Sequence, residues 1–238
     1  MGDGAADESL IPDFSVLETA EPQHVTSLDY MKIVADYRLI IDNLLDQSHV
    51  PFLHAGLLTG TVDAAVTVTQ EGQRVTRTGW CYDVPVPSLF DMIFKADGKN
   101  VDSWTEMHWH PAGCMILDAG VRVPGASKES GSGYYGLHLL TPETSTSTHY
   151  HFGAVRFNAP PRSLEEDLAI RDRLSEARRW VFAEQDAPIL EAQQRRILNT
   201  TARRPALLAV DAGPVRVQRI IAALLAEERE NEPPSTSV

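Results

Sequence analysis

Two histidines separated by four residues stand out as side chains that could hold a metal ion. His49 and His54 end a segment rich in acidic and amide side chains that begins at Asp42. On one continuous helix, residues five apart differ in direction by about 140°, so the two imidazoles would not meet. Pro51 disfavours helical backbone at Val50, which predicts that His49 ends a helix and His54 lies on the next segment. In that arrangement both rings can turn toward one point.

The polar residues before His49 offer partners for such a site. Asn43, Asp46 and His49 are spaced three apart and would line one stripe of a helix. A carboxylate one turn from a histidine can fix the tautomer of its ring, and this is the role that we predict for Asp46. The alternative is that Asn43 and Asp46 are solvated residues on the helix surface.

A metal site of this kind needs a third ligand. Two histidines and one carboxylate, with coordination positions left open, form the facial triad of non-haem Fe(II) oxygenases, which activate O₂. The helix predicted late in the chain offers Glu184, Asp186 and Glu191 as the carboxylate. Spacing alone does not choose among these three.

Four of the six remaining histidines form two H-x-H pairs, His108 with His110 and His149 with His151. Both pairs fall in predicted strands, where alternation puts the two members on one face of the sheet. They are interpreted as pocket-lining groups that contact a substrate, as a metal site of the H-x-H kind, or as half-exposed strand residues. His149 and His151 are the first candidates for substrate contact, and His138, one strand earlier, is expected to share their face.

The elements that must position these residues change type along the chain. Apolar residues spaced three and four apart predict a helix within 28–48, at least from Tyr37 on. Stretches rich in β-branched residues between 61 and 158 follow one another without helices, which predicts a mostly antiparallel sheet. The order of one helix, many strands and then long helices predicts an α+β fold, a curved sheet with helices on one side and a pocket between them.

Long helices are predicted after the strands. Ser163 opens a capping box, and Pro188 is expected to kink or restart the helix that follows. The last helix is predicted over 213–228, with a proline in its first turn. The charged residues over 171–179 are predicted to lie on solvated helix faces.

Composition narrows the class of protein. The chain has 238 residues and a formal net charge of −12, which argues against binding to nucleic acid or to an anionic membrane. No apolar run approaches the roughly 20 residues that span a bilayer, and the acidic N-terminus does not have the pattern of a signal peptide. The two cysteines, Cys81 and Cys114, are expected to be free thiols, so a cytoplasmic protein is predicted.

Four segments together resemble the catalytic domain of Rieske-type non-haem iron oxygenases, in the branch of vanillate O-demethylase and dicamba demethylase. The first segment is the one that holds the two histidines. They are residues 37–55 (YRLIIDNLLDQSHVPFLHA), 139–150 (LLTPETSTSTHY), 182–194 (FAEQDAPILEAQQ) and 211–219 (DAGPVRVQR).

The resemblance implies roles for particular residues. His49, His54 and Asp186 match the ligands of a mononuclear Fe(II), and Asn43 matches a polar residue near the iron. Asp46 matches the acidic residue that links an iron-binding histidine to a Rieske-ligand histidine of a neighbouring subunit. The fold implied is a helix-grip, START-like domain. The partners implied are a small aromatic substrate, a reductase or ferredoxin that donates electrons, and two further copies in a homotrimer.

The chain departs from the family in one respect. Family members carry a Rieske domain whose [2Fe–2S] cluster is held by C-x-H and C-x2-H motifs, and neither Cys81 nor Cys114 stands in such a motif. Residues 1–26 are therefore expected to be a linker remnant that follows a missing Rieske domain. Residues 27–230 are expected to form the catalytic domain, and 231–238 a disordered tail.

The activity predicted is O₂-dependent hydroxylation or O-demethylation of a small aromatic compound. One alternative is a catalytically inactive START-like protein that binds a hydrophobic ligand. A third interpretation is a hydrolase with an H-x-H metal site, in which the pairs at 108–110 or 149–151 would control the metal content.

Overall fold

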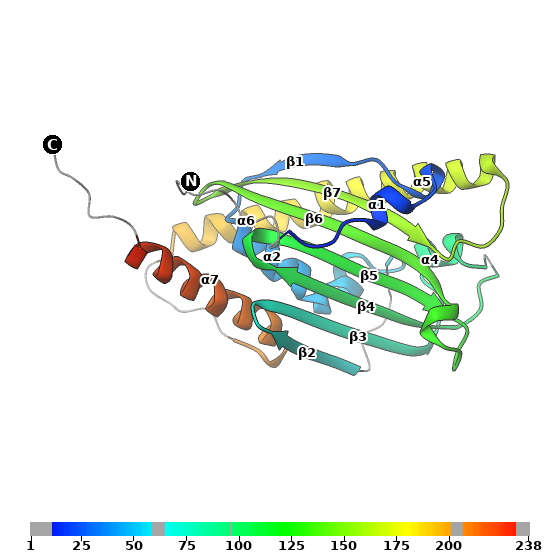
Figure 1. Cartoon of the computed structure of the whole chain (residues 1–238), viewed down its shortest axis with the longest axis horizontal. Helices are drawn as coiled ribbons and strands as arrows, with labels where there is room; N and C mark the ends of the chain where they lie inside the picture. Colours follow the sequence, from blue (N-terminus) through cyan, green and yellow to red (C-terminus); the bar gives the residue numbers. More distant parts are fainter. Residues whose placement is uncertain (1–10, 59–64, 96, 201–206, 232–238) are drawn as a thin grey trace.

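Seven antiparallel strands form one curved sheet in the order β1-β7-β6-β5-β4-β3-β2 (Figure 1). The structure is a computed structural model, and it describes residues 11–58, 65–95, 97–200 and 207–231. The strands are β1 Asp29–Ile33, β2 Ala65–Glu71, β3 Arg74–Val84, β4 Val101–His110, β5 Cys114–Arg122, β6 Ser132–Thr144 and β7 Ser147–Phe157.

The connections between strands explain this order. From β2 to β7 each strand pairs with the next along the chain, as expected for β-rich segments that follow one another without long helices. Only β1 departs from chain order, because it pairs with β7 at the far edge. The predicted antiparallel sheet is confirmed. Within 28–48, however, the helix begins only at Tyr37, and the residues before it include the strand β1.

The α-helices lie together on one side of the sheet, except for the short α1, which lies over the opposite face (Figure 1). They are α1 Val16–Thr19, α2 Tyr37–Leu45, α3 Val50–Leu53, α4 Ser88–Ile93, α5 Leu164–Trp180, α6 Ala187–Leu198 and α7 Ala212–Asn231, together with the π-helix η6 Val181–Asp186. Short 3₁₀ turns are η2 Pro22–His24, η3 Gln47–His49, η4 Pro111–Gly113, η5 Lys128–Ser130 and η7 Ala209–Asp211. The α+β, helix-grip class predicted from the sequence is thereby confirmed.

The long helix after the strands is continuous across Pro188. α5, η6 and α6 follow one another without a gap, and Pro188 stands in the first turn of α6. The predicted kink or restart at Pro188 is therefore replaced by a π-helical turn directly before it. The capping box at Ser163 is confirmed, since its hydroxyl accepts from the Glu166 N–H and the Glu166 carboxylate accepts from the Ser163 N–H.

One charge of this helix is not solvated. Arg173 and Arg179 are exposed, but Arg178 is buried, with 6% of its surface accessible. Arg178 lies four residues after the buried Leu174 and three before the buried Val181, so it belongs to the face that packs toward the sheet. The prediction that the charges of 171–179 are solvated was wrong for this residue.

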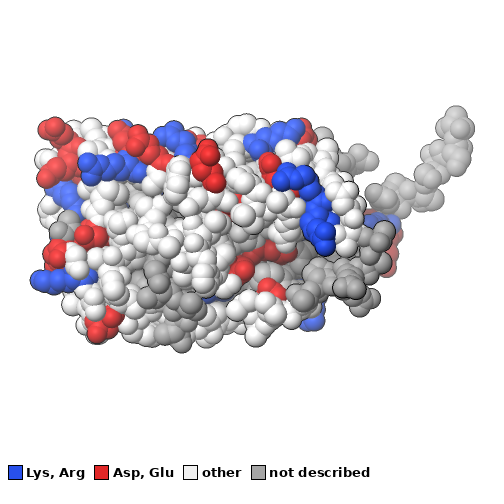
Figure 2. Space-filling view, turned by 180° about the vertical axis from the view of Figure 1, so that it is seen from behind, with Lys and Arg blue, Asp and Glu red and all other residues white. Residues whose placement is uncertain are grey.

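The apolar core fills the space between the sheet and the helices in two clusters. One cluster joins α2, α6 and α7 to the sheet, and the other joins α4 and α5 to the sheet. Seen from the helix side, much of the face is uncharged, most charged side chains lie toward its edges, and an acidic group lies right of the centre (Figure 2). None of the helices in the described ranges is both long and apolar enough to cross a bilayer.

Candidate metal centre and pocket

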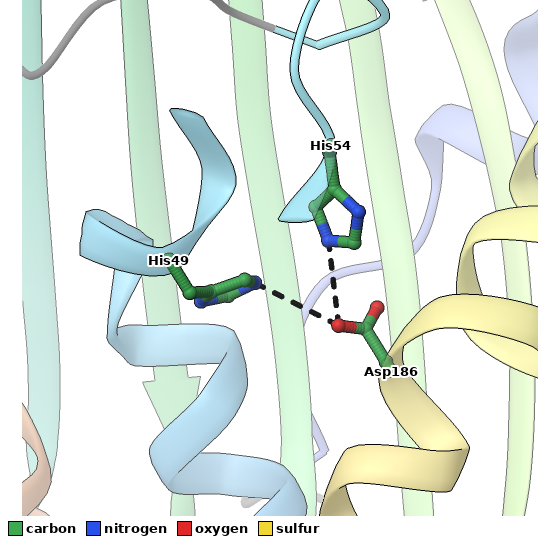
Figure 3. A group of neighbouring side chains, drawn as sticks. All are labelled: His49, His54 and Asp186. Atoms are coloured by element: carbon green, nitrogen blue, oxygen red, sulfur yellow. Dashed lines mark ion pairs between the residues drawn. The ribbon is translucent and has the colours of Figure 1, made fainter. Parts of the chain in front are cut away.

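Three side chains from two distant segments of the chain meet on the helix side of the sheet (Figure 3). The Asp186 carboxylate oxygen Oδ1 lies 3.7 Å from His49 Nε2 and 3.3 Å from His54 Nε2. Candidate ligand atoms of the three residues all lie within 4.8 Å of one another. The structure thus brings together the three residues that the family resemblance assigns to the iron. In the described part of the chain they are the one such group that could hold a metal.

The turn that lets the two histidines converge comes at Asp46. Its backbone is extended, with φ −86° and ψ 92°, so α2 ends and η3 begins there. The Asp46 carboxylate accepts a hydrogen bond from the Ser48 N–H at 2.9 Å and so caps η3. Val50 is helical, and Pro51 occupies the first turn of α3, where its missing N–H costs nothing. The prediction that Val50 is not helical was wrong. The helix is interrupted at Asp46, four residues before Val50.

The tautomer of His49 is fixed by the backbone. His49 Nδ1 lies 2.5 Å from the Asp46 carbonyl oxygen, which can only accept, so Nδ1 carries the proton. Nε2 then presents its lone pair toward Asp186. The expected tautomer-fixing partner was the Asp46 carboxylate, but that group caps η3 and the Asp46 carbonyl takes its place.

The tautomer of His54 is fixed by a residue that the sequence analysis did not identify. Gln185 Nε2 donates to the Leu53 carbonyl at 2.7 Å, which orients the amide so that Oε1 faces His54. That Oε1 accepts from His54 Nδ1 at 2.8 Å. His54 Nε2 is therefore directed at Asp186, and the ring is held in a site where only 2% of the residue is exposed.

The π-helix selects Asp186 from the three candidate carboxylates. Within η6 the backbone turns by less per residue than in an α-helix, which shifts the faces on which later residues lie. Asp186 is buried, with 4% exposed, whereas Glu184 is exposed. Glu191 accepts from the Val34 N–H and lies away from the histidines. Asn43 Nδ2 donates to Asp186 Oδ1 at 3.3 Å, which places Asn43 beside the ligands.

The electrostatics of the centre fit a divalent ion. Burial lowers the pKa of His49, which favours its neutral, metal-binding form. Burial would also lower the pKa of His54, but the hydrogen bonds to Asp186 and Gln185 and the charge of Asp186 outweigh it and raise that pKa. Ligand atoms around one ion at 2.0–2.2 Å lie roughly 3–3.5 Å apart. The two distances from Asp186 Oδ1, 3.3 and 3.7 Å, are close to that value. The donor set, the fixed tautomers and the spacing therefore fit a metal.

The metal centre opens onto a pocket between the helices and the sheet. The hollow contains about 630 Å³ that protein atoms do not fill, and this volume includes open solvent at its mouth. Most of its accessible wall is apolar, although eight polar side chains, the three ligands among them, contribute to the lining. The lining includes Leu44, Leu57, Leu58, Leu89, Met107, Leu117, Val181 and Phe182, with Asn43, Gln47, Tyr134, His138 and Arg178 as polar members beside the ligands. A second hollow shares part of this lining and extends toward Cys81 and Trp104.

Of the three histidines predicted to contact substrate, the structure places one in the pocket. His138 lines it and is 2% exposed. His138 is paired with Phe152 on β7, so the two side chains lie on the same face of the sheet. His149 and His151 alternate with Phe152 along β7 and therefore lie on the other face. The expectation that all three histidines share one face was wrong.

The two H-x-H pairs, 108–110 and 149–151, lie on the face of the sheet opposite to His138 and the pocket. His149 contacts the Tyr30 hydroxyl at 2.9 Å, and His151 lies against the same ring. His108 contacts the Thr76 hydroxyl at 3.0 Å. Neither H-x-H pair belongs to the candidate metal cluster, so the hydrolase interpretation has no support in the described residues.

Comparison with known proteins agrees with this geometry. Residues 33–227 match the family model of the vanillate O-demethylase oxygenase C-terminal domain. The chain is 31% identical to the oxygenase component of chloroacetanilide N-alkylformylase from Rhizorhabdus wittichii, over 81% of this chain and 55% of that protein. It is 32% identical to the oxygenase subunit of vanillate O-demethylase from a Pseudomonas species, over 97% of this chain and 71% of that protein.

The fold matches solved structures of a related protein. A crystal structure of dicamba monooxygenase bound to 3,6-dichlorosalicylic acid superposes with a TM-score of 0.80 at 27% identity, covering 94% of this chain and 65% of that one. Another, of dicamba monooxygenase with non-haem iron and dicamba, gives a TM-score of 0.73 at 26% identity, covering 95% of this chain and 64% of that one. The chain thus spans only part of the length of these relatives.

Proposed function

Because the chain belongs to the family of vanillate O-demethylase oxygenase C-terminal domains, we propose that it is the catalytic domain of an oxygenase acting on a small aromatic compound. The reaction is O₂-dependent hydroxylation of the ring or removal of an O-methyl group. The observation that carries the proposal is the cluster of His49, His54 and Asp186, the last two of them buried, in the lining of a mostly apolar pocket.

The proposed cofactor is one Fe(II) held by these three side chains. When bound there, it would supply the activation of O₂ that the oxygenation requires. The two histidines would bind through Nε2, because both Nδ1 atoms are occupied by the Asp46 carbonyl and by Gln185. A protein that only binds a hydrophobic ligand has no use for such a cluster, so the non-catalytic alternative is not favoured.

The other residues of the pocket have binding and positioning roles in this proposal. Leu117, Met107 and Phe182 pack against the ring of the substrate and exclude water from the reacting end. His138 contacts a polar substituent of the substrate from the sheet side. Gln185 and Asn43 act as positioning residues, since they hold His54 and Asp186 rather than the substrate.

The proposed demethylation balances with an external electron donor. An aryl methyl ether, O₂, two electrons and two protons give a phenol, formaldehyde and water. A reductase or ferredoxin supplies the electrons by way of a Rieske cluster, and the family resemblance assigns the last step of that route to Asp46 and a neighbouring subunit of a homotrimer. The Asp46 carboxylate, half-buried where α2 ends, is the group that we propose for this contact.

Hydrogen peroxide tests the proposal without the electron donor, since it is O₂ that already carries the two electrons and two protons; one of its oxygen atoms enters the product and the other leaves as water. The Fe(II)-loaded chain is incubated with peroxide and a panel of methoxybenzenes and benzenes, and formaldehyde and phenols are measured. We expect product from at least one compound, and none from Asp186→Ala treated identically. Equal product from wild type and Asp186→Ala would reject the proposed centre as the place of reaction.

A further inference from the structure

We propose that the second hollow is an extension of the substrate pocket, and that it selects aromatic compounds that carry a bulky, uncharged hydrocarbon substituent. This inference rests on the proposed function in taking the pocket beside the metal ligands as the substrate site. It adds the kind of substituent that the substrate carries, and it identifies Ser103 as a specificity-determining residue.

The second hollow adjoins the pocket at the metal centre. It contains about 570 Å³ that protein atoms do not fill, open solvent included. The two hollows have five lining residues in common, which are Gln47, Val50, Leu58, Leu117 and Tyr134. The three metal ligands line the pocket and not the second hollow. A molecule whose reacting end lies at the ligands can therefore extend past the shared residues into the second hollow.

The register of the sheet shows how the two hollows are placed. Met107 and Leu117 are paired across β4 and β5, and both line the pocket. Thr105 and Ala119 are the next pair on the same face of the sheet, and both line the second hollow. Residues two apart on a strand are separated by about 7 Å, so the floor of the second hollow begins one such step along the strands. A methyl group on a ring in the pocket is too short to span this step.

Small side chains on the inner face of the sheet leave room for a ligand there. Ser103 and Thr105 follow one another on the face of β4 that also carries Met107, and Cys81 is paired with Ser103. Ser103 and Thr105 are both half-buried although this face is turned toward the helices, so each retains accessible surface. Ser103 lines the second hollow and not the pocket, which makes it the position at which the two can be separated.

The lining determines the chemistry of the group that binds. Among the described residues, those that line the second hollow carry no charged side chain. Val50, Leu58 and Phe90 supply apolar walls opposite the sheet. Arg77, whose Nη1 donates to the Thr105 hydroxyl oxygen at 3.0 Å, does not itself line it. A charged substituent would lose its hydration without gaining an ion pair, whereas a hydrocarbon group gains from the same burial.

Equilibrium binding to the iron-free chain tests this inference. The probes are 4-methylphenol, 4-propylphenol and 4-pentylphenol, which are uncharged at pH 7.5 and are titrated by calorimetry. Each CH₂ group that is removed from water should raise the affinity about fourfold, so we expect 4-pentylphenol to bind about tenfold or more tightly than 4-propylphenol. Ser103→Phe, which places a ring in the second hollow, should reduce this ratio to about twofold or less and leave the affinity for 4-methylphenol unchanged.

Thr78→Phe is the matched control. Thr78 is also half-buried in the sheet, but it is paired with Glu106 on the face opposite to both hollows. It should leave the ratio between the two longer phenols intact. Melting curves check that the variants are folded, and the smaller Ser103→Leu, compared with Thr78→Leu, replaces the first pair if the ring at position 103 prevents folding.

Three results would each overturn the inference. They are that no phenol binds, that wild type binds the three phenols alike, or that the ratio is the same in the folded Ser103 variant as in its Thr78 control.

The test also separates this inference from the proposed function. A ratio that depends on Ser103, in a chain that binds no iron, would reject the oxygenase and keep the second hollow as a ligand site. Iron bound by His49, His54 and Asp186, in a chain whose affinity does not rise with the length of the substituent, would do the reverse.

Discussion

The Gln185 side chain offers a direct test of how the metal centre is held together. Gln185 is half-buried and cannot itself bind the ion, because its Oε1 faces His54 Nδ1 and its Nε2 faces the Leu53 carbonyl. We expect Gln185→Leu to weaken Fe(II) binding although all three ligands remain. The replacement has a similar size and is apolar, so it removes the two hydrogen bonds with little loss of packing.

The expected loss follows from the burial of His54. With 2% of the residue exposed, His54 Nδ1–H would have no acceptor in the variant when Nε2 binds the metal. An unsatisfied buried donor costs about 1–3 kcal/mol, which corresponds to roughly a 5- to 150-fold loss of affinity. Loss of a group that orients a metal-binding histidine commonly costs about 10–100-fold, which agrees with this range.

Competition with a chelator under anaerobic conditions measures this effect. The matched control is Gln194→Leu, the same replacement on the same continuous helix, where the amide oxygen accepts from the Asp36 N–H at 2.9 Å. The control should lower the melting temperature without changing the affinity for Fe(II). Wild-type affinity in Gln185→Leu, or equal losses in the two variants, would refute the idea that Gln185 positions His54.

Three further predictions concern the fold around the site. Burial holds the pKa of folded His138 at about 3, below its unfolded value, so the free energy of unfolding falls as the pH drops from about 6.5 toward 3. In urea unfolding, His138→Gln should remove about 2 kcal/mol of the fall in this free energy between pH 7 and pH 5. Curves of stability against pH that are parallel for wild type and variant would contradict this. Gly133→Ala should lower the free energy of unfolding by about 1–3 kcal/mol, since its Cβ would lie 2.1 Å from the Ala119 carbonyl oxygen, whereas the uncrowded Gly213→Ala should have little effect; equal melting temperatures would be inconsistent with this packing. Ser163→Ala should cost about 1 kcal/mol through loss of the helix cap, and unchanged urea unfolding would argue that the capping box contributes nothing.

The sequence was sufficient to predict the class of fold and to identify the segment that carries the two histidines. Antiparallel pairing follows from β-rich stretches that no long helix separates, and the sheet has that topology from β2 to β7. The expectation that no helix intervenes was wrong for the short α4, which lies between β3 and β4. The sequence pattern does not predict the strand Asp29–Ile33, because it is a short, half-exposed edge strand whose apolar residues do not alternate strictly. Its position depends on pairing with β7, a contact between residues more than a hundred positions apart.

Details of the site depended on information that local patterns do not contain. The choice of Asp186 over Glu184 depends on a π-helical turn, which the sequence does not indicate. No sequence pattern predicts that Gln185 orients His54, because a single amide side chain in a helix can have many roles. Arg178 did have a sequence signal: it shares the helical stripe of Leu174 and Val181, and a charge on an apolar stripe predicts burial. The orientation of His138 against His149 required the register of β6 with β7.

The central claim is that His49, His54 and Asp186 hold one Fe(II) at the end of a substrate pocket. The most direct measurement is the amount of iron per chain after anaerobic loading and removal of excess, for wild type, His54→Ala and Asp186→Ala. Apo melting curves of the same samples would confirm that the variants are folded. The account predicts one iron per chain in wild type and its loss in both folded variants. Wild type without bound iron, or iron retained in both variants, would contradict it.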